Sequence, residues 1–178
     1  MENIKGSINK EVIDTLVSLT RNILGDKAVD QILNNIAKKV GDNLTGRDIV
    51  FAFADEIQNI YGQNGGYAIV RQLGREVAKV LMEKHPKEEW EELFEKALNE
   101  FGFAYKIERN ESEAYIYSCV FYEGVLKPRN LEPIEHCICW YGLGFIEGFV
   151  RALEEDVKGV QWGGRDHENE KCKFVYVK

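Results

Sequence analysis

The sequence predicts an α+β fold, in which N-terminal helices pack with an antiparallel sheet of about four strands. Three observations predict it. Apolar residues recur at helical spacing over roughly the first hundred residues. Polar and apolar residues then alternate in two separate pairs of short segments. One long helical pattern that carries several glycines stands between those two pairs. Strands grouped apart from helices are typical of α+β architecture.

Five amphipathic patterns fill the N-terminal part of the chain, and residues that begin or end helices bound them. Gly25 and Gly41 can end the first two, Thr45 can cap the third, and Pro86 suits the start of the fifth. The stretch from Gly62 to Gly66 breaks the pattern between the third and the fourth. The predicted helices span residues 8–23, 26–40, 45–60, 69–81 and 86–101.

Alternating patterns after Gly102 predict two hairpins with a helix between them. The helix spans residues 137–153, and we expect its glycines to allow close packing on the sheet. A polar turn joins the strands within each hairpin. The predicted strands span residues 103–109 and 114–122 in the first hairpin, and residues 157–162 and 172–177 in the second.

Composition and charge exclude several classes of function. The net charge of −7 and the pI near 5.1 make the chain a poor partner for nucleic acid. Neither glycine cluster has the strand and helix context of a nucleotide-binding loop, so no nucleotide is expected. No apolar stretch is long enough to span a membrane, and no signal peptide is recognisable. We therefore expect a cytoplasmic protein whose four cysteines serve as thiols or metal ligands.

One run of residues carries a resemblance to a known family. The run from Cys139 to Gly148 reads CWYGLGFIEG, and the second hairpin ends in Cys172-Lys173-Phe174. Together with Cys119 on the second strand, this pattern resembles the 4-vinyl-reductase or hydrocarbon-binding domain family over residues 62–178. Its relatives in fold are the TRAPP vesicle-tethering subunits and the haem nitric-oxide-binding domains. The resemblance implies a sensor domain for small apolar molecules, often dimeric.

The resemblance also implies a metal site at a cysteine cluster. Cys119, Cys139 and Cys172 match family positions, whereas Gly164 stands where the family has a further cysteine. Thiolate ligands favour zinc, which usually takes four ligands in structural sites. The fourth-ligand candidates are Cys137, with His167 and His136 as alternatives. The alternative interpretation of all four cysteines is buried thiols that pack as small apolar residues.

Large aromatic residues and two glycines mark a candidate pocket between the glycine-bearing helix and the sheet. An ordinary core is the alternative, because aromatic side chains also dominate cores. Tyrosine hydroxyls could supply the few polar groups that ligand sites need. The candidate pocket residues are Tyr115, Tyr117, Phe121, Trp140, Tyr141, Gly144, Phe145, Gly148 and Phe149.

The leading hypothesis is thus a small apolar-molecule or lipid-binding domain of the sensor type with a cysteine-based zinc site. A TRAPP-like dimeric interaction module is the alternative, and a metal- or thiol-dependent enzyme comes third. No catalytic residues are predicted, because no triad-like spacing stands out. No haem is expected, because the propionate-binding pattern is not found. Residues 1–61 are predicted to be a helical extension that forms a homodimer, and residues 62–178 the ligand-binding domain.

Overall fold

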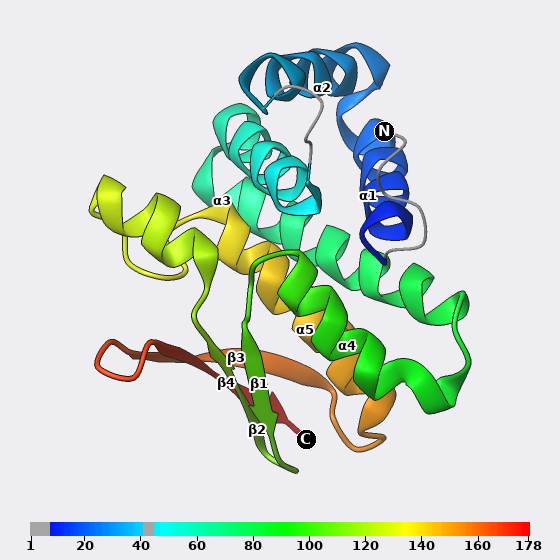
Figure 1. The fold of residues 1–178 in the computed structure, drawn as a ribbon, viewed down its shortest axis with the longest axis vertical. Helices are drawn as coiled ribbons and strands as arrows, with labels where there is room; N and C mark the ends of the chain where they lie inside the picture. The colour runs from blue at the N-terminus through cyan, green and yellow to red at the C-terminus, as the bar shows by residue number, and fades with distance from the viewer. Residues whose placement is uncertain (1–7, 41–44) are drawn as a thin grey trace.

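The computed structural model describes residues 8–40 and 45–178, and it confirms the α+β class (Figure 1). The α-helices are α1 (Ile8–Leu24), α2 (Asp26–Val40), α3 (Gly46–Glu83), α4 (Trp90–Glu100) and α5 (Cys137–Leu153). Short helical turns are η2 (Lys87–Glu89), η3 (Tyr122–Leu126) and η4 (Lys127–Arg129). The strands are β1 (Lys106–Arg109), β2 (Glu113–Tyr117), β3 (Gly159–Asp166) and β4 (Lys171–Val177). As predicted, α5 lies between the two hairpins. Within the described residues, no helix has the length and apolar character needed to cross a membrane.

The helix α3 merges two of the predicted helices. Thr45 and Asp48 form a reciprocal capping box at its start, which satisfies backbone groups that the first turn leaves free. The break predicted over Gly62 to Gly66 is confined to Gly62, whose φ of 72° only glycine adopts readily. The domain boundary predicted at residue 61 therefore falls at a kink inside one long helix.

Glycines bring α3 and α5 into close contact. A Cβ added at Gly144 would lie 2.0 Å from the carbonyl oxygen of Arg71, and one at Gly74 would lie 2.3 Å from that of Tyr141. A Cβ at Gly148 would lie 2.7 Å from the Cβ of Ala78. This corrects the prediction for Gly144 and Gly148: they face α3, where backbones meet, and not the sheet.

The sheet has the strand order β1-β2-β4-β3, and every neighbouring pair is antiparallel. The predicted second strand ends early, at Tyr117, because Ser118 takes a positive φ of 58° and the chain then turns into η3. Residues of β2 and β4 alternate between two faces. The face that carries Ile116, Cys172 and Phe174 is buried, and α5 lies beside it.

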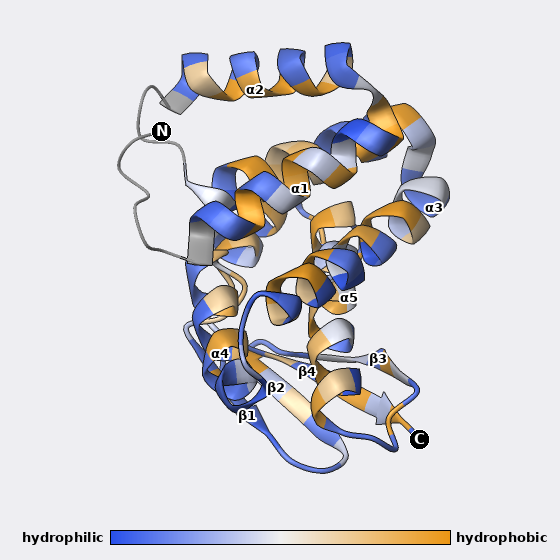
Figure 2. Cartoon of the chain, turned by 90° about the vertical axis from the view of Figure 1, so that its right-hand side faces the viewer, coloured by the Kyte–Doolittle hydropathy of each residue, from blue (hydrophilic) through white to orange (hydrophobic). Residues whose placement is uncertain are grey.

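The N-terminal helices cover α3 on the side away from the sheet. Val12, Ile13 and Leu16 of α1 are buried, as are Val29 and Ile32 of α2. Figure 2 shows the apolar side of α2 turned toward the rest of the molecule and its polar side turned outward. The apolar stripes that motivated the predicted homodimer are therefore buried within one chain. The homodimer remains a prediction, but these apolar stripes no longer support it.

Candidate functional site

Three of the four cysteines line one small cavity, named here the thiol cavity. Cys119 follows β2, Cys139 lies in the first turn of α5, and Cys172 lies on β4. The cavity has a volume of about 30 Å³, enough for roughly two water molecules. Its other walls are almost wholly apolar, with side chains that include Phe103, Phe121, Ile138, Ile146, Trp162 and Phe174. The sequence-predicted thiols thus meet between α5 and the sheet.

Burial keeps these thiols protonated. Desolvation raises the pKa of Cys119 to about 11 and raises the pKa of Cys139 as well. Desolvation also raises the pKa of Cys172, although a hydrogen bond from Arg165 partly opposes the rise. Thiols with raised pKa values are poor nucleophiles, so this cavity does not have the character of a catalytic cysteine site. A metal ion would have to displace their protons on binding.

A buried arginine borders the thiol cavity. The side chain of Arg165 is only 3% exposed, and its Nη1 donates to Sγ of Cys172 at 3.4 Å. Its guanidinium lies 3.9 Å from the ring centroid of Tyr122, and its Nη2 lies 3.7 Å from a carboxylate oxygen of Glu123. Arg165 therefore supplies a positive charge beside the thiols, which would favour thiolates over thiols when a metal binds.

The candidates for a fourth ligand are not equally placed. The thiol of Cys137 packs on α3, where a Cβ at Gly66 would lie 2.7 Å from it, so Cys137 is not near the thiol cavity. Nδ1 of His136 accepts a hydrogen bond from the backbone N–H of Ile138, and its Nε2 lies 3.0 Å from Asp55. Both nitrogens of His136 are therefore occupied, Nδ1 in capping α5 and Nε2 in the contact with Asp55 of α3. This corrects the proposals of Cys137 and His136 as ligands.

His167 remains beside the cavity. Its Nδ1 lies 3.1 Å from the hydroxyl of Tyr122, whose ring lines the thiol cavity. Its Nε2 lies 3.4 Å from a carboxylate oxygen of Glu132. In the conformation of residues 8–40 and 45–178, however, no three His, Cys, Asp or Glu side chains stand close enough together to hold a metal ion. Closing a site around an ion would require the three thiols to move inward.

The predicted pocket aromatics occupy other places. Tyr115 and Tyr117 lie on the face of the sheet opposite the cavity, where Lys171 stacks over both rings. Their hydroxyls bond to Glu113 and Glu108 on that face. The prediction fails for these two tyrosines because the register of β2 turns Ile116 inward and them outward.

The aromatic residues of α5 also lie away from the thiol cavity. Tyr141, Phe145 and Phe149 recur at four-residue spacing. Tyr141 stacks on Phe103 and Phe149 stacks on Phe94, whereas Phe145 meets Phe101 edge to face. They form ordinary core, as the alternative interpretation expected. Trp140 stacks on Tyr67 of α3, with ring centroids 4.9 Å apart. Phe121 is the one predicted pocket residue that lines the thiol cavity. Gly142 lines it too, although it was not among the predicted residues.

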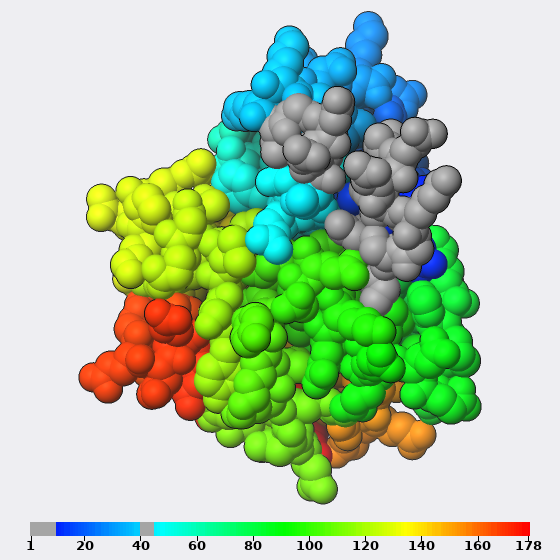
Figure 3. All heavy atoms as spheres, in the orientation of Figure 1, coloured from blue at the N-terminus to red at the C-terminus, as the bar shows by residue number. Residues whose placement is uncertain are grey.

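A second and larger hollow, named here the groove, lies between α2, the first turns of α3 and the Val120–Val125 segment. Its volume is about 380 Å³. Apolar side chains form much of its wall, and Phe121 lines both the groove and the thiol cavity. Figure 3 shows this segment at the surface beside the start of α3. The apolar lining residues are Ile32, Ile36, Phe51, Ala52, Val120, Phe121 and Val125.

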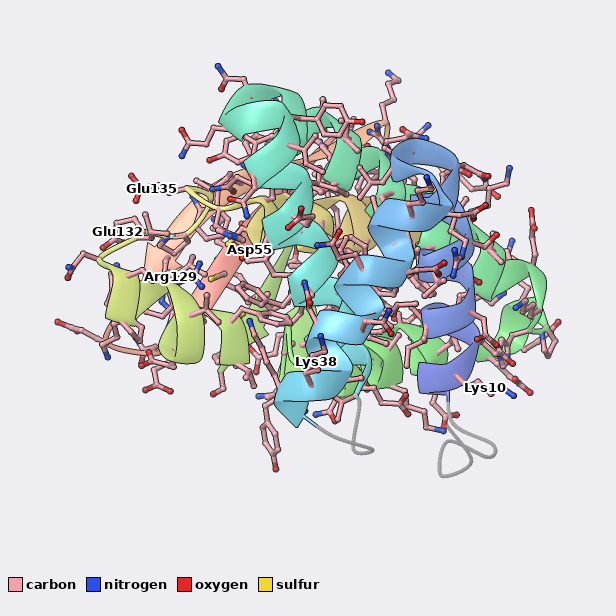
Figure 4. All side chains as sticks on the ribbon, turned by 90° about the horizontal axis from the view of Figure 1, so that it is seen from above. Lys10, Lys38, Asp55, Arg129, Glu132 and Glu135 are labelled. Carbon is pink, nitrogen blue, oxygen red and sulfur yellow. The ribbon has the colours of Figure 1, made fainter. Side chains whose placement is uncertain are left out.

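Polar groups stand around the groove. Asp55 is held by His136 at 3.0 Å and by Arg129 at 3.4 Å (Figure 4). The hydrogen bond from His136 lowers the pKa of Asp55, so this carboxylate stays charged. The ring of His136 stacks on Phe51, with ring centroids 5.5 Å apart. The other polar lining residues are Asn35, Lys39, Arg47, Asp48 and Glu56.

The groove was not predicted from the sequence, although the sequence contains one signal for it. Arg47, Phe51 and Asp55 recur at four-residue spacing and therefore share one face of α3. That face is distinct from the buried stripe of Ile49, Phe53 and Ile57. Comparison with known protein families, with curated proteins and with solved structures gives no match for this chain.

Proposed function

We propose that this chain is a small-molecule-binding domain of the sensor type, whose ligand lies in the groove. The observation that carries the proposal is a hollow of about 380 Å³ with largely apolar walls and a few polar groups. Binding sites for small molecules typically measure about 300–1,000 Å³ and have this composition. The thiol cavity, at about 30 Å³, is too small for an apolar molecule without movement of its walls.

The proposal gives the thiol cavity a metal-binding role. Cys119, Cys139 and Cys172 form a soft donor set that suits zinc, and His167 is the nearest candidate for a fourth ligand. Zinc would cross-link three segments that are distant in sequence. The resemblance to the 4-vinyl-reductase family supports both parts of this proposal.

The two sites share one segment of chain. Cys119 lines the thiol cavity, Val120 lines the groove, and Phe121 lines both. The following residues form the π-helical turn η3. Such turns are rare in proteins, and those that occur often lie at functional sites. A metal bound to Cys119 would therefore constrain a wall of the groove. This arrangement fits a sensor in which the metal and the ligand influence each other.

Filling the groove is expected to abolish ligand binding. Gly124 lines the groove, and a Cβ there would meet nothing within 4 Å. The side chain added by Gly124→Leu should therefore occupy part of the groove without a clash at its Cβ. We expect at least one of octanoate, 1-octanol and indole to raise the melting temperature of the unmodified protein saturably. At a hundredfold excess over Kd the rise should be roughly 5–10 °C. Thermal-shift measurements should show no rise in Gly124→Leu.

The control for this experiment is Gly159→Leu. Gly159 also has open space around its Cβ position, but it lies on β3 and does not line the groove. This variant should retain every thermal shift. Equal shifts in both variants would place the ligand elsewhere, and no shift in the unmodified protein with any of the three compounds would refute the proposed function.

Zinc binding is expected to depend on the cavity thiols. Protein purified without added metal should contain about one zinc ion per chain by elemental analysis. Cys139→Ala should lose it, because this thiol lines the thiol cavity, whereas Cys137→Ala should keep it, because that thiol packs on α3. Folded protein that contains no zinc by the same elemental analysis would contradict a zinc site.

A further inference from the structure

Among the described residues, one arginine of the groove lacks a charged partner. Arg47 lines the groove, and its Nε is buried without a hydrogen-bond partner. Within the described part of the chain it forms no ion pair. Burying a guanidinium N–H without a partner costs free energy, so native proteins rarely leave one in this state. All the other arginines form ion pairs in the structure, namely Arg21, Arg71, Arg75, Arg109, Arg129, Arg151 and Arg165.

The place of Arg47 suits an anion. It is the second residue of α3, so the positive end of a long helix lies beside it. Its Nε lies beside Gly102, where an added Cβ would stand 3.5 Å from it. The guanidinium presents several donors in a plane and stays charged at any physiological pH.

The carboxylates of the groove do not neutralise Arg47. The carboxylate of Asp48 is engaged in the capping box with Thr45, and that of Asp55 is held by His136 and Arg129. Glu56 lies nine residues further along α3, about 13 Å away at 1.5 Å per residue. At the Arg47 end the lining holds two cations, Arg47 and Lys39 of α2, against the one carboxylate of Asp48, so the net charge there is positive.

Beyond the Arg47 end, toward Glu56, the groove has an apolar floor. Phe51 and Ala52 lie one turn beyond Arg47 on α3, and Phe121 and Val125 line the groove from the η3 side. We infer that the groove takes a small carboxylic acid with an apolar body, its carboxylate paired with Arg47 and its body over Phe51 and Ala52. This inference rests on the proposed function, because it names the ligand class of the same groove.

The test compares three probes that share one apolar chain: octanoate, methyl octanoate and 1-octanol. Isothermal titration calorimetry with the full chain measures each Kd in the unmodified protein and in Arg47→Met, which keeps an apolar side chain but removes the charge. Octanoate should bind the unmodified protein more tightly than the two uncharged probes do. Arg47→Met should weaken octanoate by about tenfold or more, the usual worth of a hydrogen-bonded charge pair.

Three further results accompany this expectation. The affinity for 1-octanol should be unchanged in Arg47→Met, which also shows that the groove is still folded. Arg47→Lys should retain part of the affinity for octanoate. Arg151→Met should have no effect, because it removes the same charge from α5 away from the groove.

The possible failures are distinct. If 1-octanol and octanoate bind equally well and Arg47→Met changes neither, the groove binds apolar molecules without selecting a carboxylate, and only this inference is overturned. If none of the three probes binds the unmodified protein, this inference is overturned, and the groove-binding proposal is overturned as well only if indole also gives no thermal shift. If Arg151→Met weakens octanoate as much as Arg47→Met does, the effect is one of net charge and Arg47 is not the binding residue.

Discussion

Replacing Gly144 with alanine is expected to lower the free energy of unfolding by about 3 kcal/mol or more, or to prevent folding. The added Cβ would lie 2.0 Å from the carbonyl oxygen of Arg71 and 2.9 Å from its Cα. Both atoms belong to the backbone of α3, so no side-chain rotation can relieve the clash. The two helices would have to separate, and their packing forms the centre of the molecule. Urea denaturation followed by circular dichroism measures the loss.

A matched substitution separates this clash from the general effect of adding a methyl group to a helix. Gly65 lies within α3, and a Cβ there would meet only Tyr61 at 3.6 Å, which is ordinary contact. Gly65→Ala should therefore stabilise the protein by roughly 0.4–1 kcal/mol, because alanine restricts the unfolded chain more than glycine does. If both variants have the same stability, the close approach of α3 and α5 at Gly144 is wrong.

The order of the elements could be predicted from the sequence, because helical and alternating patterns differ in period. Boundaries were harder where one backbone angle decides them. The region of Gly62 to Gly66 reads as a break, yet a single positive φ at Gly62 is enough for α3 to continue as a kinked helix. Similarly, alternation carries on to Tyr122 in the sequence, but Ser118 turns the chain out of the sheet after Tyr117.

The candidate site was only partly predictable, because a helix buried all round does not reveal which neighbour each side meets. The α5 helix packs glycines on α3, aromatic residues on α4 and its adjoining loop, and Ile138, Cys139 and Ile146 toward the thiol cavity. Periodicity identifies these three sides but cannot assign them. The three cysteines chosen from the resemblance do line one cavity, whereas residue type alone misplaced most of the aromatic residues.

The groove could not be predicted from the sequence for a different reason. Its walls come from α2, α3 and η3, which are far apart along the chain, and no single segment has a distinctive motif. Arg47 has no ion-pair partner within residues 8–40 and 45–178, and this depends on where the seven other arginines find their partners, which tertiary packing sets. Charge pairing of this kind cannot be read from sequence spacing unless both partners share one helix.

Glu147 provides the second large expected effect. This carboxylate lies on α5 and is only 3% exposed, and it pairs with Arg71 and Arg75 of α3. Arg75 Nη1 donates to it at 2.8 Å, and Arg71 also donates to the carbonyl oxygen of Val160 on β3 at 2.8 Å. Glu147 therefore links α5 to α3, and through Arg71 to the sheet. This pairing explains why a charged residue can stand in an otherwise apolar helix.

Replacing Glu147 with glutamine should lower the free energy of unfolding by about 3 kcal/mol. The substitution leaves Arg71 and Arg75 close together without the negative charge between them, and it also removes the partner of Arg151, which lies 4.0 Å from Glu147. Both arginines retain some exposure, which places the cost at the lower end of the range for a broken buried ion pair. Urea denaturation near neutral pH measures it. Glu92→Gln is the control, because Glu92 pairs with Lys96 on an exposed helix face and its loss should change stability little.

The effect of Glu147→Gln should also depend on pH. Burial alone would raise the pKa of Glu147, but hydrogen bonds and charge from Arg71 and Arg75 outweigh it and hold the pKa below its usual value. A carboxylate whose pKa is lower in the folded state stabilises the fold above its unfolded pKa, about 4.3, and loses that contribution as the pH falls through the folded value. The stability difference between the unmodified protein and Glu147→Gln should therefore be full near pH 7 and shrink below about pH 4. A difference that stays constant down to that acidity would show that lost packing, and not lost charge, causes the destabilisation.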